Sequence, residues 1–371
     1  MFAKGQTVIQ YMEQLAPKHL AYPDDKIGLQ LGSLQKEIRT ILVALDVNEE
    51  VVDEAVRVGA DLIIAHHAII FRPLKHIQTD SPTGKLYERL IKNDIAVYIA
   101  HTNLDITEGG MNDWMAEALG IQNGIPIEET QHEQLYKLVV FVPKTHADQV
   151  REAVLGTGAG AIGNYSGCSF NIEGTGTFLP EEGANPFMGS IGKMEKADEV
   201  RIETIVPQGI RSHVIQAMLK AHPYEEVAYD IYPLDLKGRA FGLGRVGKLE
   251  REQTLADFAQ TVKEKLGVPH VRVVGDLDRI IRKAAVIGGS GSRYYPAARF
   301  RGADVLVTGD VDYHTAQDAF NAGIALVDPG HNAEKIMKTK VAEWMRAKLE
   351  KHRYETKVIA SEMNTEPFRF M

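Results

Sequence analysis

The sequence is poor in cysteine, since Cys168 is the only one among 371 residues. One thiol cannot form an intramolecular disulfide, and it cannot build a zinc site from several cysteines. This excludes the disulfide-stabilised scaffolds that are common outside the cell. We expect a soluble globular protein that resides in the cytoplasm.

The sequence also lacks long apolar runs and an excess of positive charge. No run is long enough to span a bilayer, and residues 1–15 have no apolar core of the kind found in signal peptides. The formal net charge of -8 gives no general attraction to the phosphates of nucleic acids. We therefore expect neither a membrane nor a nucleic acid as a partner, and we expect a small-molecule substrate.

The most informative stretch is residues 59–67, an apolar run that ends in His66 and His67. A short apolar run bounded by turn signals predicts a buried strand of a parallel sheet. Ligands collect at the carboxyl ends of such strands, and imidazole is the commonest side chain among metal ligands. The pair therefore suggests a metal site. The alternative is one core histidine and one solvated histidine. Asp46 ends the preceding strand, where it either faces the same cleft or serves as a turn residue.

A second stretch, residues 302–310, repeats this pattern of Gly-Ala-Asp, an apolar strand and polar residues. Each copy is followed by a helix and by another apolar strand that ends in polar side chains. We infer two pseudo-symmetric α/β units whose strand ends could face a shared cleft. The potential ligands are His101 and Asp105 after the first copy, and Asp328, His331 and Glu334 after the second.

The order of predicted strands and helices indicates an α/β protein interrupted by another domain. Strands alternate with helices near both ends of the chain, as in mainly parallel sheets. Between them, two strand–helix units that begin at residues 136–143 and 199–207 fit a ferredoxin-like domain. We predict a metal-site domain made of residues 1–132 and 248–371, with an insert domain at residues 133–247.

A glycine-rich loop at residues 288–293 follows a predicted strand and precedes a helix. Such a loop can present backbone N–H groups to a phosphate. It lacks the Lys-Ser/Thr ending of a P-loop, and a tight structural turn explains it equally well. The candidates for substrate binding here are Ser290, Gly291 and Arg293.

The histidines and carboxylates have the composition of a two-metal centre. Two divalent ions roughly 3.5–4 Å apart need a shared oxygen ligand, which a carboxylate can supply and an imidazole cannot. Asp105 and Glu334 are therefore the bridging candidates, with His66, His67 and His331 as terminal ligands. A set of nitrogen and oxygen ligands suits Zn²⁺, Mn²⁺, Fe²⁺ or Co²⁺. His101, His76 and His314 could move protons or orient ligands, or could be ordinary hydrogen-bonded residues.

These motifs resemble the family of GTP cyclohydrolase 1 type 2 homologues, the Nif3-like proteins with a dinuclear metal centre. The resemblance implies two divalent metal ions per subunit, zinc first among them, and a hexameric assembly. It places the ligands on His66, His67, Asp105, His331 and Glu334, although many members separate the last histidine and glutamate by one more residue. The matching stretches are residues 65–67, 101–105, 308–310 and 329–334.

Residues 222–229 resemble the longer members of this family, whose middle domain is similar to PII and CutA proteins. His222 and Glu225 could be ligands at helical spacing, but Pro223 between them favours a structural turn. The resemblance implies a metal-dependent hydrolase that acts on GTP, another nucleotide or a related phosphorylated compound. The alternative is a non-catalytic, metal-dependent regulatory or assembly protein whose insert senses a ligand.

Overall fold

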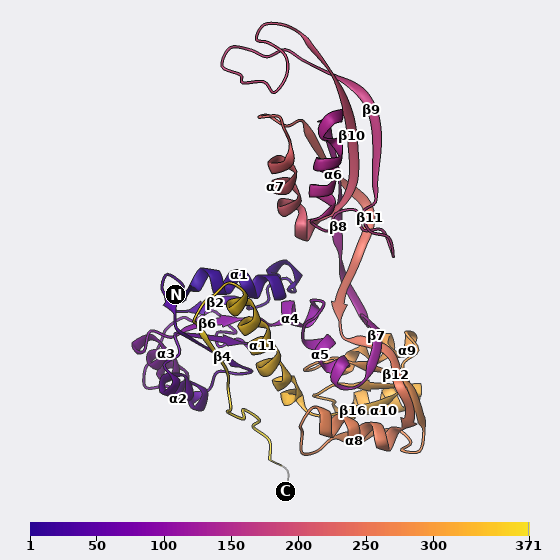
Figure 1. Cartoon of the computed structure of the whole chain (residues 1–371). Helices are drawn as coiled ribbons and strands as arrows, with labels where there is room; N and C mark the ends of the chain where they lie inside the picture. Colours follow the sequence, from indigo (N-terminus) through magenta and orange to yellow (C-terminus); the bar gives the residue numbers. More distant parts are fainter. Residues whose placement is uncertain (370) are drawn as a thin grey trace. The chain divides into compact units, whose positions relative to one another are not determined.

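The computed structural model describes residues 1–369 and 371, and the chain divides into two compact units (Figure 1). The first, the two-segment unit, comprises Met1–Gln131 and Phe241–Met371. The second, the insert unit, comprises His132–Ala240. The protein is therefore a mixed α/β protein in which one unit is assembled from both ends of the chain.

One sheet of the two-segment unit has the strand order β17-β4-β5-β6-β2. Its first four strands are parallel, and β2 runs antiparallel to β6. Every residue of β4, β5 and β6 is buried, which explains their continuous apolar runs. The bounds are β2 Gly28–Leu31, β4 Thr40–Ala44, β5 Leu62–Ala65, β6 Ala96–Ile99 and β17 Lys357–Ala360.

The other sheet of this unit has the strand order β13-β16-β15-β14-β12-β7. Its central strands β14, β15 and β16 are parallel, and the outer strands are antiparallel to their neighbours. The bounds are β7 Ile121–Ile125, β12 Arg245–Thr254, β13 Arg272–Val274, β14 Ile280–Val286, β15 Val305–Val307 and β16 Ala325–Asp328. A small sheet pairs β1 (Ala3–Lys4) with β3 (Glu37–Ile38).

Helices cover the faces of both sheets, and local capping explains where several of them begin and end. The side chain of Asn48 accepts a hydrogen bond from the Val51 amide at the start of α2, and Gly59 ends that helix in the left-handed conformation. The helices are α1 Gly5–Leu15, α2 Glu49–Val58, α3 Pro82–Lys92, α4 Thr102–Ile106, α5 Met111–Ala118, α8 Leu255–Lys265, α9 Tyr295–Phe300, α10 Tyr313–Ala322 and α11 Ile336–Lys351. Short 3₁₀ helices occupy Lys18–Leu20, Lys144–His146, Gln208–Ile210, Ser292–Tyr294 and His331–Lys335.

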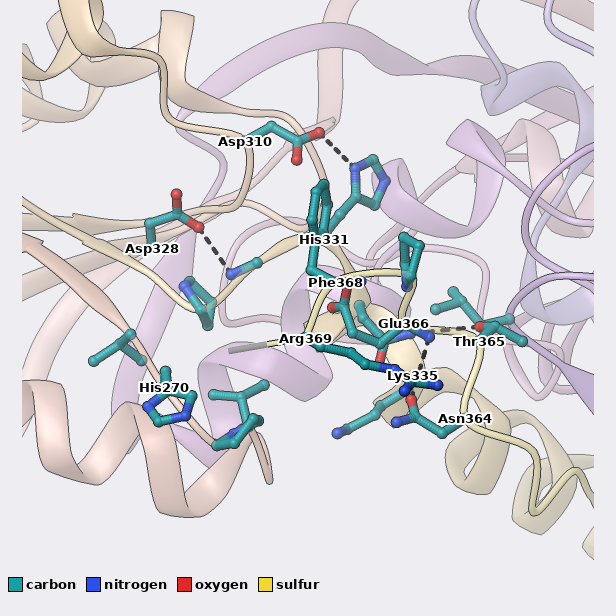
Figure 2. A pocket seen from close by; sticks show the side chains of 18 of the residues that line it. His270, Asp310, Asp328, His331, Lys335, Asn364, Thr365, Glu366, Phe368 and Arg369 are labelled. Carbon is teal, nitrogen blue, oxygen red and sulfur yellow. Dashed lines mark hydrogen bonds and ion pairs between the residues drawn. The ribbon is translucent and has the colours of Figure 1, made fainter. Parts of the chain in front are cut away.

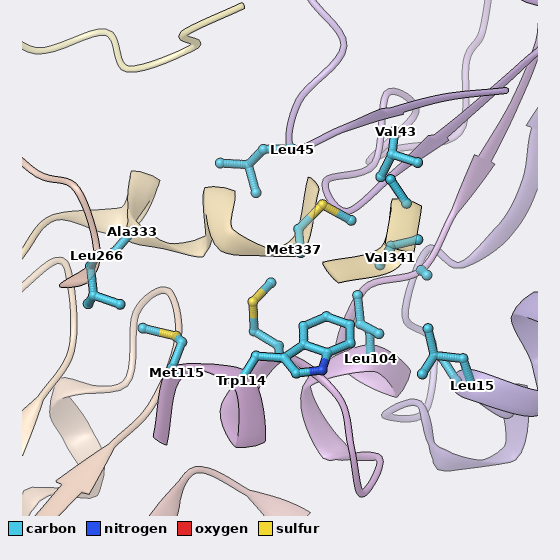
Figure 3. Close-up of a cluster of buried hydrophobic side chains, with 14 of the residues drawn as sticks. Leu15, Val43, Leu45, Leu104, Trp114, Met115, Leu266, Ala333, Met337 and Val341 are labelled. Atoms are coloured by element: carbon cyan, nitrogen blue, oxygen red, sulfur yellow. The ribbon is translucent and has the colours of Figure 1, made fainter. Parts of the chain in front are cut away.

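A single hydrophobic cluster joins the two sheets of the two-segment unit (Figure 3). Met337 and Val341 on α11 are buried, and Trp114 and Met115 on α5 belong to the same cluster. Each large apolar side chain buried in this way contributes about 1.5–3 kcal/mol relative to its exposed state. The packing therefore fixes the carboxyl ends of strands from both halves of the chain within one rigid core.

The two Gly-Ala-Asp stretches make the same hydrogen bonds. Asp61 Oδ2 accepts from the amides of residues 39 and 40, at 2.6 and 3.0 Å. Asp304 Oδ2 accepts from the amides of residues 282 and 283, at 2.8 and 3.0 Å. In each case the aspartate before one strand accepts hydrogen bonds from the neighbouring parallel strand, next to the residues where the two strands begin to pair. The repeated motif in the sequence therefore has a repeated structural task.

The insert unit contains a four-stranded sheet in the order β11-β8-β10-β9, with α6 and α7. Apolar side chains of β8, β10, α6 and α7 form its own buried cluster. Within its 222–229 stretch, His222 Nε2 donates to the Phe141 carbonyl and Nδ1 accepts from the Tyr224 amide. His222 therefore holds the turn, while Glu225 accepts from the Asn185 amide in the segment between β9 and β10. The elements are β8 Glu128–Pro143, α6 Ala147–Leu155, β9 Ser169–Phe178, β10 Glu195–Pro207, α7 Arg211–Ala221 and β11 Tyr229–Leu243.

Across the described residues, the longest helices fall short of the length and apolar character needed to cross a membrane.

Candidate metal centre

The five ligands predicted from the sequence converge within the two-segment unit. His66 and His67 follow β5, Asp105 lies on α4, and His331 and Glu334 lie on the 3₁₀ helix before α11. Their ligand atoms form overlapping groups in which all atoms lie within 4.8 Å of one another. These groups are His66 with Asp105 and Glu334, His67 with His331 and Glu334, and His66 with His67 and His101. We call the six residues the histidine–carboxylate cluster.

Glu334 lies at the centre of the cluster and is almost fully buried. Its Oε1 atom is 3.7 Å from His66 Nε2, and its Oε2 atom is 3.1 Å from His67 Nε2. Oε2 is also 3.3 Å from His331 Nε2. Asp105 Oδ1 approaches His66 Nε2 to 3.6 Å. Of the two carboxylates, Glu334 thus has the geometry to be shared between two groups of ligands.

Every histidine of the cluster is held by a hydrogen bond from its Nδ1 atom. Because the partners are carbonyl or carboxylate oxygens, Nδ1 donates, and the Nε2 atoms of His66, His67 and His331 face Glu334. Such partners fix the ring orientation of a metal-binding histidine and strengthen it as a ligand. The acceptors are the Ala100 carbonyl for His66 (2.8 Å), Asp46 for His67 (2.6 Å), Asp25 for His101 (2.9 Å) and Asp310 for His331 (2.7 Å).

Several of these supporting residues were not identified from the sequence. Asp25 precedes His101 by 76 residues and lies in a loop without a recognisable motif. Asn112 is fully buried, and it joins the Asp105 carbonyl (2.9 Å) to the Gly288 amide (2.9 Å). Asp46 and Asp310 lie at the ends of apolar strands, and this position in the sequence is the feature that could have identified them. His76 and His314 are exposed and belong to none of the ligand groups found among the described residues.

Two buried polar atoms in the cluster lack a hydrogen-bond partner among the described residues. They are His66 Nε2 and Asp105 Oδ1, which face each other. Leaving a buried polar atom unpaired costs about 1–3 kcal/mol. A divalent cation would satisfy both, and imidazole nitrogens with carboxylate oxygens are a suitable donor set for such an ion. The residues present therefore fit a metal ion.

The cluster strongly perturbs the ionisation of its members. Burial opposes charge on His67, but hydrogen bonds to Asp46 and Glu334 outweigh it and raise the pKa of His67 to about 10. The hydrogen bond to Glu334 is the main cause that raises the pKa of His331 to about 9. Burial raises the pKa of Asp105 to about 6. Burial also acts to raise the pKa of Glu334, but the surrounding histidines hold it well below its usual value. The anionic Glu334 is thus the electrostatic centre of the cluster.

The glycine-rich loop at residues 288–291 packs directly against this centre. A Cβ atom on Gly289 would lie 2.8 Å from Glu334 Oε1 and 3.1 Å from His331 Nε2. The loop can approach the ligands so closely because it carries no side chain at that position. The Gly291 amide donates to Thr308 Oγ1 (2.8 Å), while Ser290 and Arg293 are exposed. The guanidinium of Arg293 donates to the Tyr294 hydroxyl (3.0 Å).

A pocket of about 940 Å³ opens beside His67 and His331 (Figure 2). One wall comes from residues 268–272, another from residues 328–332, and a third from residues 364–369 near the C-terminus. The lining combines apolar groups with the cationic side chains Arg272, Lys335 and Arg369 and the acidic side chains Asp46, Asp310, Asp328 and Glu366, and Arg272 pairs with Asp328. Ser290, Gly291 and Arg293 are not part of this lining. The pocket therefore places apolar groups and charged groups of both signs next to the cluster.

Fold and site together define a mixed α/β protein with a histidine–carboxylate cluster that could bind metal. The model of the Duf34/NIF3 (NGG1p interacting factor 3) family matches residues 3–367, and the chain belongs to this family. The resemblance inferred from the motifs is thereby confirmed.

Similar proteins match along the whole chain. A protein of Halalkalibacterium halodurans named GTP cyclohydrolase 1 type 2 homolog is 55% identical, with coverage of 100% of this chain and 99% of the relative. A Bacillus subtilis protein of the same name is 51% identical, with coverage of 99% and 98%. The crystal structure of a Bacillus cereus protein related to NIF3 superposes with a TM-score of 0.93 at 53% identity, covering 100% of both chains.

Proposed function

We propose that the protein binds two divalent metal ions in the histidine–carboxylate cluster and hydrolyses a nucleotide or a related phosphorylated compound. The observation that carries this proposal is the position of Glu334, whose two oxygens face different groups of ligands. His66 and Asp105 would hold one ion, His67 and His331 the other, and Glu334 both. Zinc is our first candidate, with iron, manganese and cobalt as alternatives.

Residues of the chain would hold the metal ligands in place, and the bound metal would activate water and substrate. A bound divalent ion lowers the pKa of water and polarises the atom under attack. Asp46, Asp310 and the Ala100 carbonyl keep the histidine rings aligned, so little reorganisation is needed when a substrate binds. His101 lies within reach of His66 and His67, where it would serve as a further ligand or move a proton.

The pocket next to His67 and His331 supports a phosphorylated substrate. Lys335 and Arg369 provide positive charge, and the exposed ring of Phe368 provides a flat apolar surface. Ser290 and Arg293 stay the candidates for phosphate binding suggested by the sequence. Gly291 is a weaker one, because its amide already donates to Thr308.

We also propose a more specific fold than the mixed α/β class for each unit. Each of the two large sheets in the two-segment unit contains three parallel strands that follow one another along the chain, with an aspartate in the same role, and this supports two pseudo-symmetric units. The β-α-β-β-α-β order of the insert unit supports a ferredoxin-like, PII/CutA-like domain. From the family resemblance we also propose a homohexamer, which light scattering of the purified protein would test.

A substrate screen with metal-loaded protein tests the proposed reaction. Nucleotides, GTP included, and other phosphorylated compounds would be incubated with the protein, with and without a chelator. We expect slow turnover of one class that is lost on chelation and in the His331→Ala variant. Arg293→Ala and Lys335→Ala should weaken substrate binding while metal content stays unchanged. Metal-loaded protein that neither binds nor converts any phosphorylated compound would favour the non-catalytic regulatory or assembly role.

A further inference from the structure

The end of the chain lies against the candidate metal centre, although it contributes no ligand to it. After β17, residues 361–369 run without regular secondary structure, and we call them the C-terminal segment. Residues 364–369 of this segment line the pocket beside His67 and His331 (Figure 2).

The first part of the C-terminal segment is anchored to two helices. Glu54 on α2 is only 3% exposed, and its carboxylate accepts from the Ser361 hydroxyl and from the Glu362 amide (3.0 Å). Lys338 on α11 donates to the Met363 carbonyl (2.9 Å). A buried carboxylate used in this way is costly unless its hydrogen bonds are made, so these contacts define the path of the segment.

The next contact leads directly to a candidate ligand. Thr365 Oγ1 donates to Asp46 Oδ2, while Asp46 Oδ1 accepts from His67 Nδ1 at 2.6 Å. One carboxylate oxygen of Asp46 thus accepts a hydrogen bond from Thr365, and the other accepts one from the imidazole of His67. Without the threonine, the carboxylate could rotate about its Cβ–Cγ bond and lose its alignment with the ring. Asn332, which follows His331, lies 3.5 Å from the same hydroxyl.

We infer that the C-terminal segment contributes to metal binding, because its residue Thr365 positions His67 through Asp46. The chain Thr365–Asp46–His67 sets which nitrogen of His67 carries the proton and where Nε2 points. This inference rests on the proposed metal binding at the cluster. It assigns Thr365 a positioning role, because its hydroxyl acts through Asp46 and contacts none of the candidate ligands.

Substitutions at Thr365 distinguish the contribution of its hydroxyl group from the contribution of its side-chain size. Thr365→Val keeps the size of the side chain and removes the donor, whereas Thr365→Ser keeps the donor. Thr315→Val is the matched control, since Thr315 on α10 donates to Asp312 in the same way but outside the cluster. Affinity for Zn²⁺ would be measured by competition with a chromophoric chelator. The visible spectrum of the Co²⁺-substituted protein would report on ligand geometry.

We expect Thr365→Val to weaken Zn²⁺ binding roughly threefold to tenfold. Substituting a residue that bonds directly to a metal ligand typically costs about tenfold or more, and Thr365 is one residue further away. Its Co²⁺ spectrum should change, while Thr365→Ser and Thr315→Val should behave as wild type. Thermal melts of the metal-free proteins would show that the variants fold. Unchanged affinity and spectrum in Thr365→Val would overturn the inference, as would equal losses in the valine and serine variants. If the wild type itself binds no metal, the proposed function fails instead.

Discussion

Glu334 is the residue on which the candidate metal centre depends most, because each of its oxygens faces different histidines. Asp105 contacts one of those histidines, His66, and belongs to one ligand group only. Both are carboxylates, and the sequence offered them as equivalent bridging candidates. The difference between them is a matter of geometry and leads to different expectations for their variants.

Replacing either carboxylate by its amide should therefore have unequal effects. We expect Glu334→Gln to lose metal from both ligand groups and Asp105→Asn to retain roughly half of the wild-type content, because an amide lacks the charge that holds two cations together. Elemental analysis after identical loading and desalting would measure this. Glu343→Gln, an exposed position on α11, is the control. Equal metal content in both variants and the wild type would refute the assignment.

Among the secondary-structure elements and loops, the glycine-rich loop lies close to the candidate ligands because two of its residues have no side chain. Gly289 adopts a φ of +59° beside Glu334 and His331, and its neighbour Gly288 leaves an equally tight space. The sequence suggested phosphate binding for this loop, with a tight structural turn as the alternative. The packing against the ligands gives Gly288 and Gly289 a structural role, while Ser290 and Arg293 stay candidates for phosphate binding.

Gly289→Ala should interfere with metal binding as well as strain the backbone. The added methyl group would meet Glu334 Oε1 at 2.8 Å, so we expect at least a tenfold loss of Zn²⁺ affinity in addition to about 1–2 kcal/mol of strain. Gly323→Ala is the matched control, since Gly323 has a φ of +78° and open space around it. Chelator competition and thermal melts would separate the two effects. A loss of affinity equal to that of the control would contradict this role of the loop.

In the insert unit, the turn after α7 depends on a neutral histidine. His222 is 7% exposed and uses Nε2 as a donor to Phe141 and Nδ1 as an acceptor from Tyr224. Burial is the main cause that lowers the pKa of His222 from its ordinary 6.5, while the hydrogen bond to the Phe141 carbonyl and the charge of Glu199 oppose it and His146 adds to it. Protonation of Nδ1 would break the hydrogen bond from the Tyr224 amide.

The stability of the insert unit should therefore depend on pH through His222. Because the folded pKa lies below the unfolded value, this contribution is present above pH 6.5 and declines as the pH falls through 6.5. Hydrogen exchange of amides in β8 and β10 would be compared between the wild type and His222→Gln at a pH on each side. We expect the advantage of the wild type to shrink at the lower pH. His222→Ala should cost about 1–3 kcal/mol, because the partner groups lose their hydrogen bonds. A wild-type advantage independent of pH would contradict the assignment.

At the scale of the whole molecule, all six cluster residues belong to the two-segment unit and none to the insert unit. The two-segment unit also has its own hydrophobic cluster, which includes side chains from both of its large sheets. It should therefore fold and bind metal without the insert.

Replacing residues 132–240 with a short Gly/Ser linker tests this separation. We expect a folded protein whose Zn²⁺ affinity is within about threefold of the full chain, because no ligand or ligand-orienting residue is removed. Circular dichroism and chelator competition would measure folding and affinity. The Asp105→Asn change in the same background would show that binding occurs at the cluster. An insoluble or metal-free product would mean that the insert is needed to complete the core.

Local patterns predicted much of this molecule, while contacts between distant residues could not be read from the sequence. The apolar runs predicted the buried strands β5 and β15, because burial on both faces leaves a continuous apolar signal. The strand-end position suggested His66 and His67. The orienting partner Asp25 and the C-terminal Thr365 lie in segments without periodicity, and their roles depend on packing across 76 and 319 residues. The short helix α4, which carries Asp105, was also missed because five residues give no helical period.

The most direct test of the central claim is an X-ray diffraction measurement on crystals of the zinc-loaded protein at the zinc absorption edge. We predict anomalous peaks within coordination distance of Glu334, one beside His66 and Asp105 and the other beside His67 and His331. The Asp46 and Asp310 carboxylates should stay on the Nδ1 side of their histidines. Protein that is replete with zinc but shows no anomalous peak next to Glu334 would show that the histidine–carboxylate cluster is not the metal site.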